Sequence, residues 1–304
     1  MTGKRQEFWG GLGLSAALLV FCSVALAQPD GNEILGTLKK VRDTGVITLG
    51  IREASVPFSY LNAKGQPIGY SIDLCHAIVD EITTAIDGRT PTIKYLPVTS
   101  ETRMDALISG KIDLECGSTT NNVERQKRVA FSPVMFVSGT KVMVRKSSGI
   151  RSFRDLKGKT VVVTAGTTNE PAMRKLSEQF NLGLNIVMGR DHGESYAMVA
   201  DNKADAFATD DALLFGFIAK NKAQKDFTVV GDFLSYDPYG IMFRKDDPQL
   251  ADVVNRTFRN LAESRDLEYT YNRWFLRKLP NGDRLNLPMS AQLLQSFQIL
   301  GLPE

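Results

Sequence analysis

Short apolar runs rich in β-branched residues alternate with amphipathic stretches of helical period along most of the chain. Strands are predicted at 46–51, 92–96, 112–116, 140–144, 160–164, 185–187, 206–209, 227–230 and 240–244. Helices are predicted at 71–86, 103–109, 122–128, 170–180, around Ser195, at 211–219 and at 248–263, before a helical C-terminal remainder anchored by Trp274 and Phe275. Strands that alternate with helices are typical of an α/β protein.

The alternation falls into two series, and the second begins with the strand predicted at 140–144. Each series is long enough to bury a sheet of its own. The pattern therefore predicts a duplicated α/β plan with a cleft between the halves. Ligands of such sheets bind beyond the carboxyl ends of the strands, so functional side chains are expected directly after predicted strands.

The first residues have the pattern of an export signal. Lys4 and Arg5 precede an apolar run at 12–26 that closes on the small-x-small pattern Ala25-Leu26-Ala27. A single membrane anchor is the alternative, but the run is shorter than the roughly 20 residues of a spanning helix. We predict a signal peptide over residues 1–27, cleaved after Ala27, and a mature protein in the periplasm.

Composition and charge exclude some classes of partner. The 304 residues are 43% hydrophobic and 23% charged, which is ordinary for a globular protein large enough for two domains. The formal net charge is +3, and removal of Lys4, Arg5 and Glu7 with the signal subtracts +1 and leaves +2. This balance does not indicate a nucleic-acid partner.

Cysteine and histidine are scarce in the predicted mature chain. Cys75 and Cys116 are expected to be two free, mostly buried thiols, because their spacing does not show that the side chains meet, although the periplasm permits a disulfide. His76 and His192 without a paired cysteine motif supply too few ligands for a structural zinc site. No metal and no cofactor are expected.

Polar side chains follow the first predicted strands. Arg52 ends the first strand, and a solvated surface arginine is the alternative interpretation. In the segment 99–103, Ser100 can cap a helix whose free N–H groups lie near Arg103, and anions favour that arrangement. Plain helix capping is the alternative, although it leaves Arg103 without a role.

Two further strand ends lead through hydroxyl-rich turns into helices. In the segment 115–125, Ser118 and Thr120 can hydrogen-bond an anion that Arg125 grips with two donors. The segment 164–170 has a glycine turn and a helix start. It lacks the lysine of a phosphate-binding loop and the spaced glycines of a dinucleotide loop, so a nucleotide site is not indicated.

The segment 206–211 is a small apolar strand that ends in two carboxylates, Asp210 and Asp211. One of them can accept hydrogen bonds from an ammonium group while the other caps the following helix. A reaction that needs two carboxylates is the alternative, but no partner nucleophile or metal cluster accompanies them. The pattern therefore favours a binding protein over an enzyme.

Four motifs together resemble the glutamate/aspartate periplasmic binding proteins of the polar amino-acid ABC transporter family. They are the segments 52–60, 115–127, 191–193 and 210–214, and they span nearly all of the predicted mature chain. The resemblance implies a type II periplasmic-binding-protein, or Venus-flytrap, fold with two doubly wound domains joined by two hinge strands. Domain 1 is then expected at 28–137 plus 234–304 and domain 2 at 138–233, with hinge crossings near 136–140 and 229–234.

The resemblance also implies a division of the ligand-binding residues. Arg125, Ser118, Thr120 and Thr168 would hold the α-carboxylate, Asp210 the α-ammonium, and Arg52, Ser100, Arg103 and His192 the side-chain carboxylate. A neutral histidine satisfied in a helix-opening turn is the alternative for His192. The chemistry agrees, because a dicarboxylic amino acid needs two anion sites and one cation site. Three arginines against one aspartate leave +2 for a ligand of charge −1, so another acid or water must absorb the surplus.

We therefore expect the periplasmic substrate-binding component of an ABC importer. It would bind L-glutamate or L-aspartate by cleft closure, act as a monomer, and deliver the ligand to membrane permease subunits. Two alternatives stay open: a periplasmic cyclohexadienyl-type dehydratase on the same fold, and a ligand sensor without transport.

Overall fold

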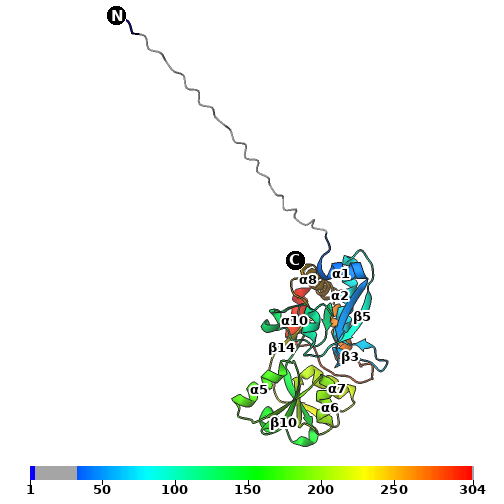
Figure 1. Ribbon diagram of the computed structural model, residues 1–304. Coiled ribbons are helices and arrows are strands. Elements are labelled where there is room, and N and C mark those ends of the chain that lie inside the picture. The colour runs from blue at the N-terminus through cyan, green and yellow to red at the C-terminus, as the bar shows by residue number, and fades with distance from the viewer. Residues whose placement is uncertain (4–32, 303–304) are drawn as a thin grey trace. The chain divides into compact units, whose positions relative to one another are not determined.

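The computed structural model describes residues 1–3 and 33–302 (Figure 1). The chain separates into a short N-terminal unit, 1–33, and a compact unit that begins at Ile34. All helices and strands described below belong to the second unit. The predicted signal sequence and its cleavage site, from Lys4 to Ala27, lie outside the described residues.

The first of two five-stranded sheets has the strand order β5-β1-β6-β15-β7. Its strands are β1 (Val46–Ile51), β5 (Thr92–Pro97), β6 (Leu114–Cys116), β7 (Val129–Phe131) and β15 (Met242–Arg244). Strands β5, β1 and β6 are parallel, whereas β15 is antiparallel to both of its neighbours. The residues of β1 that pack into the core, Ile47, Leu49 and Ile51, alternate along the strand.

The second sheet repeats this plan with the strand order β11-β10-β12-β9-β13. Its strands are β9 (Thr140–Arg145), β10 (Thr160–Thr164), β11 (Asn185–Gly189), β12 (Ala206–Asp210) and β13 (Phe227–Val230). Strands β11, β10 and β12 are parallel, and β9 is antiparallel to β12 and β13. Nine of the ten strands in the two sheets were predicted from the apolar runs. The exception is β7, whose three residues are too few to show a pattern.

Helices cover both faces of the second sheet (Figure 1). Val161 and Val163 of β10 pack in one apolar cluster with Met173 of α5 (Asn169–Gln179). Val162 packs in the opposite cluster with residues of α6 (His192–Ala200) and α7 (Asp211–Lys220). The alternation of side chains along one strand thus divides the core into two layers.

The predicted helices are also confirmed. The helices outside the second sheet's layers are α1 (Gly36–Thr44), α2 (Tyr70–Ala85), α3 (Arg103–Ile108), α4 (Val123–Gln126), α8 (Pro248–Glu263), α9 (Asp266–Phe275) and α10 (Ala291–Leu300). Single turns of 3₁₀-helix lie at Lys146–Ser148 and Phe153–Leu156. Trp274 and Phe275 are buried as anchors of α9, as their apolar side chains predict.

Five short strands form two small sheets. Strands β8 (Phe136–Ser138) and β14 (Asp237–Tyr239) form an antiparallel ladder, and each lies in the chain between strands of the first and second sheets. The second strand of this ladder begins after the range 229–234 expected for a crossing. Strands β2 (Ala54–Ser55), β3 (Ser59–Leu61) and β4 (Pro67–Ile68) form the other small sheet.

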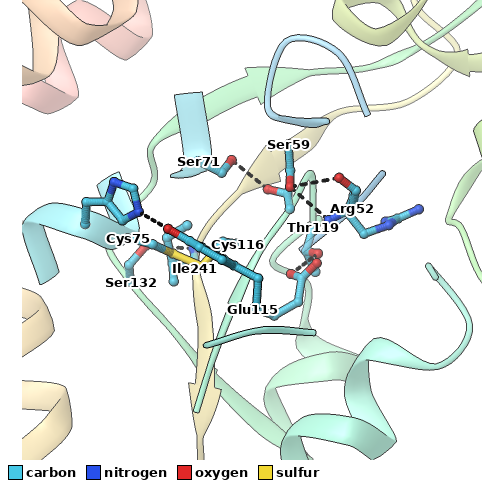
Figure 2. The surroundings of a disulfide bond; sticks show 12 residues. Arg52, Ser59, Ser71, Cys75, Glu115, Cys116, Thr119, Ser132 and Ile241 are labelled. Carbon is cyan, nitrogen blue, oxygen red and sulfur yellow. Dashed lines mark hydrogen bonds between the residues drawn. A yellow bond between two sulfur atoms is a disulfide. The ribbon is translucent and has the colours of Figure 1, made fainter. Parts of the chain in front are cut away.

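The expectation of two free thiols is wrong. Cys75 of α2 and Cys116 of β6 form a disulfide, with their Cα atoms 6.2 Å apart (Figure 2). Helix α2 packs along β6, and its Ser71 hydroxyl also donates a hydrogen bond of 2.8 Å to the carbonyl of Gly117. The two cysteines meet because α2 packs against β6, and their separation in the sequence does not reveal that tertiary contact. The disulfide holds α2 to the end of β6.

None of the helices in the described part of the chain is long and apolar enough to cross a membrane.

Candidate functional site

The side chains predicted to bind ligand follow the carboxyl ends of parallel strands in both sheets. Arg52 follows β1, and the turn at 117–122 follows β6 of the first sheet. In the second sheet, β10 leads into the turn before α5, and Asp210 is the last residue of β12. These are the positions at which an open α/β sheet presents groups to a ligand.

Hydrogen bonds join the two sets of strand ends into one site. Ser55 Oγ lies 2.9 Å from His192 Nδ1, and Thr120 Oγ1 lies 3.4 Å from Thr168 Oγ1. Gly166 has a positive φ of +73°, and a Cβ atom there would lie 2.7 Å from the backbone of Glu101. Only glycine permits this backbone approach without a shift.

Buried polar atoms without a hydrogen-bond partner gather at this site. Among the described residues, the buried side-chain atoms of this kind are Arg52 Nη1, Ser100 Oγ, Arg103 Nε, Glu115 Oε1, Ser118 Oγ and His192 Nε2. Five of these six residues were predicted as ligand contacts. Buried polar groups in proteins are nearly always paired, so a cluster of unpaired ones is typical of a site for a polar ligand.

The two arginines of the first sheet are positioned by hydrogen bonds: Arg103 through its side chain to Thr119 and Ser118, and Arg52 through its backbone to Ser59. Arg103 Nη1 donates hydrogen bonds of 2.6 Å to Thr119 Oγ1 and 3.3 Å to the carbonyl of Ser118. The backbone N–H of Arg52 donates to Ser59 Oγ at 2.8 Å. Arg52 and Arg103 are each 2% exposed. Burial, and then repulsion by Arg103, lowers the pKa of Arg52 to about 10, so this guanidinium stays charged near neutral pH, and burial also lowers the pKa of Arg103.

Arg125 lies on α4, whose first turn is capped by the side chain of Asn122. Its Nη1 donates a hydrogen bond of 2.8 Å to the carbonyl of Thr120, and its Nη2 lies 3.4 Å from the carbonyl of Gly166. Burial, and then the charge of Arg103, lowers the pKa of Arg125 to about 9. Arg125 therefore carries its charge between the strand ends of the two sheets.

Asp210 has a donor on each carboxylate oxygen. Asn169 Nδ2 donates to Oδ1 at 2.8 Å, and the hydroxyl of Tyr239 donates to Oδ2. Burial, and then the charge of Asp237, raises the pKa of Asp210 to about 7. Asp211 has a different environment, because its Oδ1 accepts from the Ser138 hydroxyl at 2.6 Å and the Ala212 N–H at 2.8 Å. The two adjacent carboxylates thus have separate roles, and Asp210 faces the predicted ligand contacts.

His192 opens α6 with its ring buried. Its Nδ1 pairs with Ser55, whereas Nε2 has no partner. Burial, followed by the charges of Arg52 and Arg103, holds the pKa of His192 well below its usual value. The ring is therefore neutral near pH 7 and can donate or accept one hydrogen bond through Nε2.

Comparison with known proteins decides the family. Bacterial extracellular solute-binding proteins, family 3, match residues 47–277 of the chain. The chain belongs to this family. Over 264 residues it is 44% identical to the L-glutamate/L-aspartate-binding protein of Pseudomonas aeruginosa, covering 86% of this chain and 87% of that protein. It is 40% identical over 288 residues to the glutamate/aspartate import solute-binding protein of Escherichia coli, covering 94% of each.

Solved structures agree with this assignment. A mutant of ArgBP from T. maritima superimposes with a TM-score of 0.70 at 27% identity, over 79% of this chain and 99% of that one. An ancestral amino acid-binding protein, a precursor of cyclohexadienyl dehydratase, superimposes with a TM-score of 0.68 at 28% identity, over 79% of this chain and 99% of that one. The predicted type II fold is confirmed.

For this solute-binding protein, the structure also identifies the acids that the charge count lacked. Glu115 is fully buried and lies near Arg52 and Arg103, and Asp237 accepts hydrogen bonds from Thr120 at 3.2 Å and Thr168 at 3.0 Å. Three arginines (+3) and the carboxylates of Asp210 and Glu115 (−2) leave +1 for a ligand of charge −1, and Asp237 adds a further carboxylate beside Thr120 and Thr168. A carboxylate inside the apolar run of β6 was a signal that could have been noticed, whereas nothing in the pattern around Asp237 indicates its position.

Proposed function

We propose that this solute-binding protein captures L-glutamate or L-aspartate in the periplasm and delivers it to the permease subunits of an ABC importer. The observation that carries the proposal is the cluster of unpaired buried groups, which comprises two guanidinium groups, two hydroxyls, one neutral histidine and one oxygen of Glu115 among the described residues. The names of the relatives in Pseudomonas aeruginosa and Escherichia coli support the same ligands.

The resemblance to glutamate/aspartate-binding proteins implies the division of the site, and the charges agree with it. Arg125, Ser118, Thr120 and Thr168 take the α-carboxylate, Asp210 takes the α-ammonium, and Arg52, Ser100, Arg103 and His192 take the side-chain carboxylate. A neutral amino acid leaves buried arginines unpaired, which costs several kcal/mol, against about 1.5 to 3 kcal/mol gained from each charged hydrogen bond. Acidic ligands are therefore selected mainly by this penalty.

Ligand binding couples to closure of the two domains. Strands β8 and β14 serve as the hinge, with domain 1 carrying the first sheet and domain 2 the second. The bonds from Ser55 to His192 and from Thr120 to Thr168 belong to the closed form. The closed monomer is the form that the permease recognises.

Calorimetry of the mature protein tests the ligand. We expect strong binding of glutamate or aspartate, weaker binding of glutamine, and weaker binding still of a neutral apolar amino acid such as leucine. Comparable affinities for all four would overturn the proposal.

A dehydratase is the second candidate, because Asp210 has the raised pKa, about 7, that suits a general acid. The ancestral relative described as a precursor of cyclohexadienyl dehydratase has the same fold. Two buried arginines, Arg52 and Arg103, and the partly buried Arg125 favour binding over this reaction, since the substrate ring needs an apolar pocket. Turnover of prephenate by the purified protein would establish the enzyme, and its absence together with glutamate binding supports the binding protein.

A further inference from the structure

Glu115 is one of two buried acids at the site, with Asp237, that have no role in the division of ligand contacts. Its side chain is fully buried at the middle of β6, between Leu114 and Cys116. Its Oε2 accepts a hydrogen bond of 2.6 Å from the hydroxyl of Thr119, whereas its Oε1 has no partner. An acidic side chain in an apolar strand is costly to bury, so a compensating interaction is required.

Thr119 connects this carboxylate to one arginine of the site. Its hydroxyl donates to Glu115 while accepting from Arg103 Nη1 at 2.6 Å (Figure 2 shows the bond between Thr119 and Glu115). One hydroxyl can do both, because it has one proton and free lone pairs. Arg103 and Glu115 are thereby held on either side of a single oxygen atom.

Gly117 brings the same carboxylate close to the second arginine. A Cβ atom at Gly117 would lie 2.2 Å from Glu115 Oε1 and 3.0 Å from Cγ of Arg52. The carboxylate oxygen and the stem of Arg52 therefore approach each other across the space that the missing side chain leaves. Glu115 also attracts all three guanidinium groups of the site, those of Arg52, Arg103 and Arg125.

We infer that Glu115 sets the charge that the site accepts on the ligand side chain. It reduces the two positive charges of Arg52 and Arg103 to a net charge of +1, which one side-chain carboxylate neutralises. Glu115 does not touch the ligand in this role and acts through the arginines, as a specificity-determining residue. This inference rests on the proposed binding of acidic amino acids.

The test measures the ratio of the dissociation constants for glutamine and glutamate in four proteins: wild type, Glu115→Gln, Arg103→Gln and the double variant. In Arg103→Gln, the charges of Arg52 and Glu115 sum to zero, so the ratio should fall. Adding Glu115→Gln restores +1 and should raise the ratio again by at least about tenfold, because at an effective dielectric constant of about 20 one unit charge changes affinity roughly tenfold even from about 12 Å, and more from closer. Glu115→Gln alone should raise the ratio above that of the wild type.

Thr119→Val is the matched control, since it removes the hydrogen bond to Glu115 but keeps the charge. It should weaken both ligands with little change in their ratio. If Glu115 has only a structural role, Glu115→Gln will weaken both ligands equally and the double variant will keep the ratio of Arg103→Gln, which would overturn the inference.

Folding is followed by thermal unfolding without ligand. If Glu115→Gln does not fold, the double variant decides, because it has the charge of the wild type. The inference is supported if the double variant unfolds cooperatively and has a higher ratio than Arg103→Gln. It is overturned if the double variant also does not fold. A wild type that binds no glutamate would overturn the proposed function itself, whereas glutamate binding with unmoved ratios would overturn this inference alone.

Discussion

The two sides of the site differ in how their polar groups are satisfied. Of the six unpaired buried side-chain atoms in the described part of the chain, five belong to the first-sheet side and one, His192 Nε2, belongs to the second. On the second-sheet side, Asp210 has donors on both oxygens, and Asn169 donates to both Asp210 and Thr140 at 2.8 Å. The second side is therefore organised in advance, whereas the first side has groups that a ligand can satisfy.

This difference separates two tasks. Unpaired groups of the first sheet discriminate between ligands, because each buried donor left without a partner costs free energy. The prearranged carboxylate of the second sheet offers the same partner to the ammonium group of any amino acid. In the proposed division of the site, selectivity therefore depends mainly on the first side, and the second side contributes His192 and the partner of the ammonium group.

The largest expected effect concerns the disulfide, which exists on the first side alone, since residues 138–233 contain no cysteine. Replacing Cys75 and Cys116 by serine should lower the free energy of unfolding by about 4 kcal/mol, the chain-entropy value for a separation of 41 residues. Urea denaturation with and without reductant measures this. The double variant should be insensitive to reductant, and an unchanged unfolding free energy in both tests would contradict the prediction.

Asp210, on the second-sheet side, should make ligand affinity depend on pH. The pKa of Asp210 is about 7 without ligand, and an ammonium group needs the ionised carboxylate. Below pH 7, binding must release a proton, so the affinity should fall by up to about tenfold per pH unit, and it should be constant above. The pKa of His192 is lowered, so His192 should not add to this transition.

Calorimetry from pH 5.5 to 8 in buffers of different ionisation enthalpy measures both the affinity and the released proton. Asp210→Asn should bind more weakly at pH 8 and lose the pH dependence. The stability of the ligand-free protein should change with pH in the opposite direction to ligand affinity. Because the pKa of Asp210 is raised in the folded state, its contribution to the free energy of unfolding is present below pH 4 and is lost as the pH rises through about 7. A pH dependence that survives in Asp210→Asn would assign it to another group.

The sequence revealed the strands of both sheets but not all the partners of the site residues. Apolar runs of five or six residues predicted β1, β9 and β10, because a buried strand leaves a direct hydrophobic signal. Strand ends then predicted where charged and hydroxyl side chains gather. Of the unforeseen acids, Glu115 left a local signal as a carboxylate within an apolar strand, whereas Asp237 bonds Thr120 and Thr168, which lie 117 and 69 residues away in the chain.

The disulfide was missed for the same reason. Its two cysteines meet because α2 packs along β6, which is a tertiary contact. The hydrogen bond from Ser71 to Gly117 shows that this packing also fixes the backbone from which Ser118 and Thr120 project. Sequence reasoning therefore found the chemistry of the site but not the supports that place it.

The smallest expected effect concerns a contact between the two sides outside the ligand site. Asn281, in the segment after the residues that match the family, donates hydrogen bonds of 3.0 Å to the carbonyls of Ala219 and Lys220 at the end of α7. The last carbonyls of a helix lack partners within it, so this amide ties the C-terminal segment to the second-sheet side.

Asn281→Ala should remove about 1 kcal/mol from the closed form, which corresponds to about fivefold faster ligand dissociation. The association rate should stay unchanged, because the ligand meets the first-sheet side before closure. Stopped-flow fluorescence with glutamate measures both rates, and Arg284→Ala, at an exposed residue of the same segment, is the control. Equal changes in association and dissociation would show that Asn281 shapes the ligand-free protein instead of holding the two sides together.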